Sequence, residues 1–429
     1  MDTPILDFLR AYAVSGTSRL HIPAHKGRGE LGCEAMDITE ISGADDLAQP
    51  SGILLESERS AAGIFGAGQT CYLTGGSSQG IKAMLHLAAL QRRGVILAGR
   101  NAHKAFFHAC ALLDLPVRWL YGENLCSCRV TPASLEEAIA ASPEPLAAVY
   151  VTSPDYLGNV LDIASLAELA HRYSLPLLVD NAHGSYLTIY GRHPIALGAD
   201  LCCDSAHKTL TALTGGAYLH MKTPDPRARE AISIYGTSSP SYLILASLDG
   251  CNRALREFSA QSAGAFAARL ADLAAALPFP NRSEEPWKIT LDCAPIGASG
   301  SEVAQRLRHF SAEPEFADED FVVLMLSPRN TEEDLQRILS ALGDYPVRPP
   351  RAPLLAPVPG EQVLSLREAM LAPRENVAVS RAAGRICASA AISCPPAIPL
   401  VVPGERISPE AAAQMAARGI AEIGVISSQ

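Results

Sequence analysis

The sequence predicts an α/β protein built around a mainly parallel sheet, and two observations carry this prediction. From about residue 70 to residue 225, short apolar runs alternate with amphipathic segments that begin with helix-start signals. The chain has 429 residues, of which 48% are hydrophobic and 19% charged, so it can bury a large core in two or three domains. Strands and helices that alternate in this way build a parallel sheet with helices on both faces.

The apolar runs are the candidate strands of this sheet. Each run is short and rich in aliphatic residues, which is typical of strands buried on both faces. The predicted strands are Val95–Ala98, Val117–Leu120, Leu146–Thr152, Leu175–Asp180 and Ala217–Met221.

The helices between the strands are predicted from periodicity and from capping residues. Apolar residues repeat with the helical period over residues 81–88, directly after a glycine-rich turn. Thr131 followed by Pro132 combines an N-cap with proline at the first helical position. Asp162 can cap a further helix that runs through Tyr173.

The chain beyond this region is predicted to form smaller units. Strands at Lys288–Asp292 and Phe321–Ser327, with a helix from Asn330 that stops at Gly343, indicate a second α/β unit. A proline-rich stretch then predicts a linker. The predicted division is 1–275 for an N-terminal segment and the large domain, 276–344 for a small α/β domain, 345–361 for the linker, and 362–429 for a C-terminal α+β domain.

Charge and cysteine usage exclude several classes of protein. The net charge is −10, so no basic field attracts nucleic acid or an anionic membrane, and neither is a predicted partner. No apolar run has the roughly 20 residues needed to cross a bilayer, and the N-terminus lacks the features of a secretion signal. The 11 cysteines lie mostly in apolar stretches, which indicates buried side chains in a reducing cytoplasm. The pairs Cys126/Cys128 and Cys202/Cys203 lack zinc-site spacing, so no metal is predicted.

The first candidate site segment is GGSSQG at 75–80, a small, hydroxyl-rich turn that leads into a helix. Backbone N–H groups at a helix start, together with the hydroxyls of Ser77 and Ser78, can hold a phosphate. Taken alone, the same residues are equally good turn and cap residues.

The second candidate is Asp180, at the end of the apolar run LPLLVD. In α/β sheets, ligands bind at the carboxyl ends of the strands. A carboxylate there can hold a cation, a metal or a ring N–H, although a helix cap or turn residue is an equal alternative.

The third candidate is Lys208, in the stretch DSAHKTLTALTGG. Lysine is usually exposed, but this one lies in a weakly charged stretch between two strand-like segments. Such a lysine can lose its proton and attack an aldehyde as an amine, and the preceding Ser205 and His207 can hold an anion. A phosphate loop, an acidic partner and a Schiff-base lysine are what a protein supplies to pyridoxal 5′-phosphate (PLP).

Motifs along the whole chain resemble those of the Orn/Lys/Arg decarboxylase family, in a short form without an N-terminal flavodoxin-like wing. The resemblance begins at HIPAHKGRG (21–29) and continues through eight segments in family order. These are GADDL (43–47), GGSSQG (75–80), RNAHKA (100–105), VTSPDYLGNVLDI (151–163), DNAHGSY (180–186), DSAHKTL (204–210), TSSPSYLILASLD (237–249) and PPAIPLVVPGE (395–405).

The resemblance implies an aspartate-aminotransferase-like (fold type I) PLP enzyme and assigns roles to individual residues. Lys208 would carry PLP as a Schiff base, and Asp180 would pair with the pyridinium nitrogen and make the ring an electron sink. His103 would stack on the ring, with His183 beside it. The predicted phosphate-binding side chains are Ser77, Ser78, Ser205 and His207.

The same resemblance implies a soluble cytoplasmic lyase that decarboxylates arginine, lysine or ornithine to the amine and CO2, feeding polyamine synthesis. The segment around Ser238 and Ser239 implies a homodimer with shared active sites. The distal charge of the substrate needs a carboxylate, for which the candidates are Asp45, Asp46 and Glu315, each also a candidate surface, cap or salt-bridge residue.

The sequence departs from the family pattern in several segments that could shape the substrate pocket, although none of the departures removes a cofactor residue. PAHK replaces PGHK, Ala105 replaces a serine, Cys394-Pro-Pro-Ala-Ile-Pro replaces YPPGIP, and Tyr186 stands where many members have a histidine. Fold alone does not decide the reaction. An aminotransferase, a β-eliminating lyase, or a non-catalytic regulatory homologue are therefore the alternatives.

Overall fold

The computed structural model describes residues 3–390 and 397–427. Cys394, Pro395 and Pro396, which belong to the predicted C-terminal motif, lie outside the described residues. The chain forms two compact units, one made of residues 1–93, 147–149 and 163–260 and the other of residues 94–146, 150–162 and 261–429. The division into four parts predicted from the sequence stays a prediction.

The largest sheet has seven strands in the order β1-β7-β6-β5-β4-β2-β3. Pairs β2–β3 and β5–β6 are parallel, whereas β7 is antiparallel to both of its neighbours. The prediction of an α/β fold with a mainly parallel sheet is therefore confirmed. The strands are β1 (Gln69–Leu73), β2 (Val95–Gly99), β3 (Val117–Leu120), β4 (Leu146–Thr152), β5 (Leu177–Asp180), β6 (Leu201–Asp204) and β7 (Ala217–Met221).

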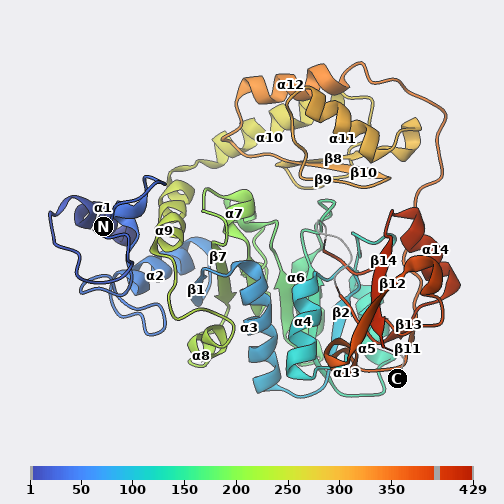
Figure 1. Cartoon of the computed structure of the whole chain (residues 1–429), viewed down its shortest axis with the longest axis horizontal. Helices are drawn as coiled ribbons and strands as arrows, with labels where there is room; N and C mark the ends of the chain where they lie inside the picture. The colour runs from blue at the N-terminus through green and yellow to red at the C-terminus, as the bar shows by residue number, and fades with distance from the viewer. Residues whose placement is uncertain (1–2, 391–396, 428–429) are drawn as a thin grey trace. The chain divides into compact units, whose positions relative to one another are not determined.

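The first unit contains β1, β5, β6 and β7 with their covering helices. Helices α1, α2 and α9 pack on one another, and α2 and α9 also contact β1, while α3 contacts β1, β6 and β7 (Figure 1). Its core centres on the buried aromatic side chains of Phe65, Tyr72, Tyr218 and Tyr242. The helices are α1 (Pro4–Val14), α2 (Ile53–Phe65), α3 (Gly76–Gln91), α6 (Ile163–Arg172), α7 (Ala206–Thr209), α8 (Ala228–Ser233) and α9 (Tyr242–Glu257), with 3-10 turns at Glu34–Met36 and Ser185–Tyr190.

Helix α6 begins directly after Asp162, as the sequence predicts, but it ends at Arg172, before the predicted Tyr173. The chain turns at this point, because Ser174 adopts a left-handed conformation with φ of 55°. The helix therefore stops one residue earlier than its apolar repeat suggested.

A buried carboxylate fixes the start of α1 in this unit. The N-cap residue of α1 makes no side-chain capping bond. Instead, the Asp249 carboxylate from α9 accepts hydrogen bonds from the backbone N–H groups of Ile5 (2.9 Å) and Leu6 (3.1 Å). The first N–H groups of a helix need such acceptors, and a negative charge favours the positive end of the helix dipole.

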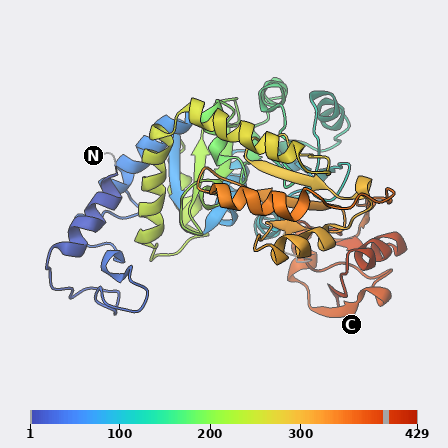
Figure 2. The same ribbon diagram turned by 90° about the horizontal axis from the view of Figure 1, so that it is seen from above.

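The second unit contains a three-stranded antiparallel sheet in the order β8-β10-β9. Helix α11 packs on β10 and on α12 (Figures 1 and 2). Both helices begin with reciprocal capping boxes, Ser299 with Glu302 and Thr331 with Asp334. These elements are β8 (Lys288–Asp292), β9 (Phe316–Ala317), β10 (Phe321–Met325), α10 (Ala260–Ala275), α11 (Gly300–His309) and α12 (Glu332–Leu342), with a 3-10 turn at Ala294–Ile296.

The rest of the second unit comprises two helices near β2 and β3 in sequence and the C-terminal elements. Two small antiparallel sheets, β11–β13 and β12–β14, form the C-terminal part. The elements are α4 (Lys104–Leu113), α5 (Pro132–Ala140), α13 (Leu366–Leu371), α14 (Pro409–Ala417), β11 (Glu361–Gln362), β12 (Arg374–Ala378), β13 (Glu405–Arg406) and β14 (Glu422–Ile426), with a 3-10 turn at Val379–Arg381.

Two expectations about the chain as a whole can be compared with the described residues. Apart from Cys33, which is half-buried, the described cysteines are buried and free, as their apolar surroundings predicted. No helix in the described part of the chain is long and apolar enough to span a bilayer.

Candidate cofactor site

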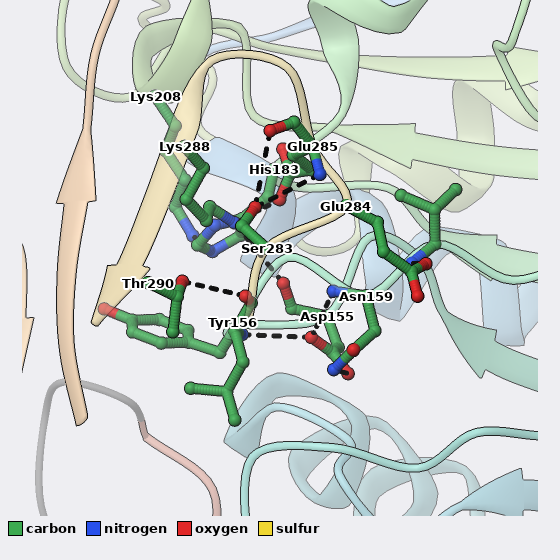
Figure 3. A network of polar contacts seen from close by, with 12 residues as sticks. Asp155, Tyr156, Asn159, His183, Lys208, Ser283, Glu284, Glu285, Lys288 and Thr290 are labelled. Atoms are coloured by element: carbon green, nitrogen blue, oxygen red, sulfur yellow. Dashed lines mark hydrogen bonds and ion pairs between the residues drawn. The ribbon is translucent and has the colours of Figure 1, made fainter. Parts of the chain in front are cut away.

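The candidate nucleophile Lys208 lies in the short helix α7, directly after β6. Ser205 is the N-cap of this helix, and its carbonyl accepts a hydrogen bond from the Lys208 backbone N–H at 3.0 Å. The Lys208 Nζ lies 3.0 Å from Nε2 of His183, a residue only 4% exposed (Figure 3). One of these two nitrogens therefore carries a proton that the other accepts. The predicted position of His183 beside the cofactor ring stays a prediction.

The start of α3 brings hydroxyl groups from two distant segments together. The Ser205 hydroxyl donates to the Ser77 hydroxyl at 2.7 Å, across 128 residues of sequence. Ser78 follows in the same first helical turn. The first N–H groups of a helix have no partner within the helix, and the helix dipole favours an anion there. Two predicted phosphate-binding segments thus meet at one helix N-terminus.

Gly76 and His207 complete this end of α3 and the turn opposite it. Gly76 has a left-handed φ of 70°, and apart from its chain neighbours and the backbone of its own helix no atom lies within 4 Å of a Cβ added there, so the space beside this first residue of α3 is open. Its N–H donates to the carbonyl of Gly215 at 2.8 Å. The His207 ring Nδ1 lies 3.1 Å from the Gly216 carbonyl, which fixes the proton on Nδ1 and orients the ring.

Asp180 is the last residue of β5 and is 2% exposed. It lies opposite Cys203 in the parallel pairing of β5 with β6, so Asp180 and the Lys208 segment leave the sheet at the same edge. One carboxylate oxygen accepts the backbone N–H of Ala182 at 3.1 Å. The carboxylate is therefore positioned by its own turn, at the edge of the sheet where α/β proteins bind ligands.

His103 belongs to the second unit, where it is the N-cap of α4. Its Nδ1 accepts a hydrogen bond from the backbone N–H of Ala105 at 3.2 Å, so the neutral ring carries its proton on Nε2. The cap role explains the imidazole orientation from local structure alone. Its predicted stacking on a cofactor ring stays a prediction.

The predicted substrate carboxylates have local partners. Asp45 accepts hydrogen bonds from the N–H groups of Ser51, Gly52 and Leu54. Partial burial raises the pKa of Asp45, but these backbone donors together lower it by more, so the pKa lies below its usual value. Asp45 thus shapes its own loop. Asp46 is exposed and accepts the Ala48 N–H.

The remaining named positions fall into exposed and buried groups. Glu315 is exposed and accepts the hydroxyl of Tyr156 at 2.9 Å. Ser238 and Ser239 lie in an exposed segment. Tyr186, by contrast, is 1% exposed within the 3-10 turn that follows the Asp180 strand.

The motif at 151–163 supplies a buried polar turn in the second unit, which the sequence did not predict. The Asp155 carboxylate accepts the N–H of Leu157 (3.0 Å) and the amide of Asn159 (2.8 Å), and burial raises its pKa (Figure 3). Lys288, 3% exposed, forms an ion pair with the buried Glu285 and lies 3.4 Å from the Asp155 carbonyl. The hydrogen bond of Thr290 with the Leu157 carbonyl (2.8 Å) joins β8 to the same turn.

Sequence reasoning also missed a fully buried cluster of His193, Asp204 and His220 in the first unit. His193 lies in a turn, and His220 and Asp204 lie on neighbouring antiparallel strands. The only sequence signal is a polar residue inside each of two apolar strands. That signal cannot show that the two residues face each other.

Known proteins resemble this chain in sequence and in fold. A family model described as "Orn/Lys/Arg decarboxylase, major domain" matches residues 3–263, and the C-terminal domain model of the same family matches residues 363–417. The lysine decarboxylase LdcF of Francisella novicida superimposes with a TM-score of 0.79 at 17% identity, covering 99% of this chain and 81% of that one. The constitutive lysine decarboxylase of Escherichia coli gives a TM-score of 0.78 at 16% identity, covering 99% and 82%.

Fold and site thus define a PLP-dependent enzyme of fold type I. The chain belongs to the Orn/Lys/Arg decarboxylase family, and it is accordingly a PLP-dependent decarboxylase. Among curated relatives, the uncharacterized protein YaaO of Bacillus subtilis is 29% identical over 96% of this chain and 93% of its own length. The arginine decarboxylase of the same organism is 28% identical over 95% of this chain and 92% of its own length.

The residues present fit PLP. The open N-terminus of α3 with the paired Ser77 and Ser205 hydroxyls suits a phosphate dianion. The buried Asp180 suits a ring N–H, and the amine of Lys208 suits an aldehyde carbon. All four lie in the first unit.

Proposed function

We propose that this chain removes the α-carboxylate of a basic amino acid, and that its substrate is arginine. The observation that carries the proposal is the Lys208–His183 contact at the edge of the sheet where Asp180 ends its strand. Support for arginine comes from relatives that align along nearly the whole chain. Arginine decarboxylases of B. subtilis and Bacillus anthracis each align with 95% of it, whereas the constitutive lysine decarboxylase of E. coli aligns with 52%.

The proposed residue roles are those that the family resemblance implies, and several charges and contacts of the site support them. When bound, PLP supplies an electron-accepting ring next to the substrate amine. Lys208 holds the aldehyde end, and Ser77, Ser78, Ser205 and His207 hold the phosphate. The buried Asp180 carboxylate stabilises a proton on the ring nitrogen, because an anion in a low-dielectric site favours the cationic form of its partner.

His183 and His103 have different proposed roles. His183 exchanges a proton with the Lys208 amine across their 3.0 Å contact, and so keeps that amine oriented. His103, whose ring is already oriented by its cap bond to Ala105, stacks on the cofactor ring. The protein acts as a homodimer in which the exposed segment around Ser238 and Ser239 approaches the neighbouring active site.

The experiment that tests the reaction incubates PLP-loaded protein with single amino acids and no keto acid, with products identified by mass spectrometry. Agmatine and CO2 from arginine, with little amine from lysine or ornithine, is the expected result. Cadaverine or putrescine as the main product would replace arginine by lysine or ornithine. A keto acid, or the amine form of the cofactor, would instead indicate transamination.

The lysine assignment has its own test and a matched control. Lys208→Ala should abolish the visible absorbance band of the bound cofactor, because no amine remains to bond its aldehyde carbon. Lys222→Ala, an exposed lysine just after β7 in the same unit, should keep the band. An unchanged spectrum in Lys208→Ala would refute the assignment.

Light scattering of the wild-type protein tests the homodimer, and a monomer with full activity would refute shared sites.

A further inference from the structure

The carboxylate of Asp204 is a buried anion at the end of β6, hydrogen-bonded to the residue that follows the end of β5. Asp204 is the last residue of β6, four residues before Lys208, and its side chain is 0% exposed. One oxygen, Oδ1, accepts the side-chain amide of Asn181 at 2.7 Å and faces the Cys202 thiol at 3.4 Å. The other, Oδ2, accepts Nε2–H of His193 at 3.1 Å. A buried charge persists only when it is satisfied in this way.

The two histidines keep this carboxylate ionised. Burial alone would raise the pKa of Asp204, but His193 and His220 lower it to well below the usual value. Burial also lowers the pKa of His220, so that ring is neutral. The Thr70 hydroxyl lies 2.9 Å from Nδ1 of His220, and Nε2 lies 3.5 Å from Asp204 Oδ2, a favourable but long contact. The Asp204 carboxylate is therefore ionised inside the protein.

Asn181 links this anion to the neighbouring strand. It directly follows Asp180, and its backbone N–H donates to the Cys203 carbonyl at 2.9 Å while its side chain donates to Asp204. Asn181 is 0% exposed, so no water competes for these bonds. Two hydrogen bonds thus join the residue that follows β5 to the end of β6. Asn181, next to Asp180, donates to Cys203 and Asp204, which lie five and four residues before Lys208.

We propose that Asp204 is a positioning residue that holds the Asp180 strand end in register with the Lys208 segment and supplies a fixed negative potential to both. The inference rests on the proposed function, in which Lys208 holds the aldehyde end of PLP and Asp180 stabilises the proton on the ring nitrogen. Asp204 acts through its hydrogen bond with Asn181 and through its charge.

The Cys203 thiol is a buried neighbour of Asp204 in β6. Burial is the main reason why the pKa of Cys203 is well above its usual value, and the charges of Asp180 and Asp204 raise this pKa further, whereas Lys208 lowers it. A negative charge nearby stabilises a cation, so loss of the Asp204 charge should lower the pKa of a protonated group bound to Lys208 or Asp180.

His193, Asp204 and His220 could be taken for a metal site, because their possible ligand atoms lie within 4.8 Å of one another. The surroundings favour hydrogen bonding. The N–H of His193 is directed at the carboxylate, and the Phe65 ring packs against His193 and His220 at 4.9 and 4.4 Å. A catalytic metal keeps an open position for water, and this cluster is 0–1% exposed.

The test compares Asp204→Asn and Asn181→Ala with a control, Asp249→Asn. Asp249 is also a 0% exposed carboxylate of the first unit with backbone donors, but it caps α1. Three properties are measured: PLP dissociation from the loaded protein, the pH midpoint of the cofactor's visible band, and the melting temperature of the cofactor-free protein. Asp204→Asn should weaken PLP binding about tenfold and lower the midpoint. Asn181→Ala should weaken PLP binding to a similar extent.

The control separates positioning from general stability. Asp249→Asn should lower the melting temperature while PLP affinity and the pH midpoint stay at wild-type values. The positioning role would be overturned if Asp204→Asn and Asn181→Ala both kept the wild-type PLP affinity and the wild-type pH midpoint of the visible band. The proposed function would still stand in that case, provided that Lys208→Ala loses the band. Absence of any visible band in PLP-loaded wild-type protein would overturn the proposed function itself. One tightly bound metal ion per chain would overturn the hydrogen-bonded arrangement. If Asp204→Asn fails to fold, Asn181→Ala alone decides.

Discussion

Replacement of His183 tests whether its contact with Lys208 orients the reacting amine. His183 Nε2 lies 3.0 Å from Lys208 Nζ, and the imidazole is 4% exposed, so no water readily replaces it. A hydrogen bond with one charged partner contributes about 1.5–3 kcal/mol. Its loss in His183→Ala should therefore reduce kcat about tenfold to about a hundredfold. His183→Gln keeps an amide oxygen that can accept from the Lys208 amine, and should recover most of the loss.

The assay is kcat and KM for arginine, measured with the melting temperature of each variant. His171→Gln is the control, since His171 pairs with Asp200 at 2.8 Å on the surface of the same unit, away from Lys208 in sequence and partners. The control should keep wild-type kcat. If His183→Gln is as slow as His183→Ala, the hydrogen bond is not what His183 contributes, and proton transfer by the imidazole replaces orientation as its role.

Three further predictions concern Asp180 and the buried charges of the second unit. Asp180→Ala should retain some PLP but lower kcat severely, because the ring nitrogen loses its stabilising anion; near-normal turnover would remove Asp180 from that role. Burial raises the pKa of Asp318 to about 6, above its unfolded value of 3.8. Ionisation of Asp318 therefore destabilises the folded state, fully above about pH 6, and this penalty disappears as the pH falls towards 4. Asp318→Asn should thus be more stable than wild type at pH 8, by at most about 3 kcal/mol, and equal to it at pH 4 in urea titrations; equal stability at both pH values would contradict the raised pKa. Lys288→Met leaves the buried Glu285 without this ion-pair partner and should lower the free energy of unfolding by about 3–5 kcal/mol. The double variant with Glu285→Gln should recover most of that loss, and a double variant as unstable as the single one would show that the pair is not the cause.

Local sequence determined the strands and helices that follow simple burial patterns. The predicted bounds of β3, β4 and β7 match the structure, and helix α5 begins at Pro132 with Thr131 as its N-cap. These features depend on neighbours along the chain: an apolar run needs burial on both faces, and a cap bonds an N–H two or three residues away. Lys208 was indicated because a lysine in a weakly charged stretch between strands is unusual on its own, whereas Asp180 had an equal alternative as a cap or turn residue and gained its predicted role from the family resemblance.

Tertiary structure alone decided which distant side chains meet. The Ser205–Ser77 hydrogen bond joins segments 128 residues apart. The Asp204 cluster includes His220 because β7 runs antiparallel to β6 in a register that no local pattern contains, and it includes His193 from the segment between β5 and β6. Periodicity reports whether a side chain is buried, but its partner depends on strand order and register, which the packing of the whole sheet sets. The sequence therefore determined the fold class and predicted Lys208 and Asp180 as the two principal cofactor residues, and the tertiary structure determined which buried polar side chains lie beside their strand ends.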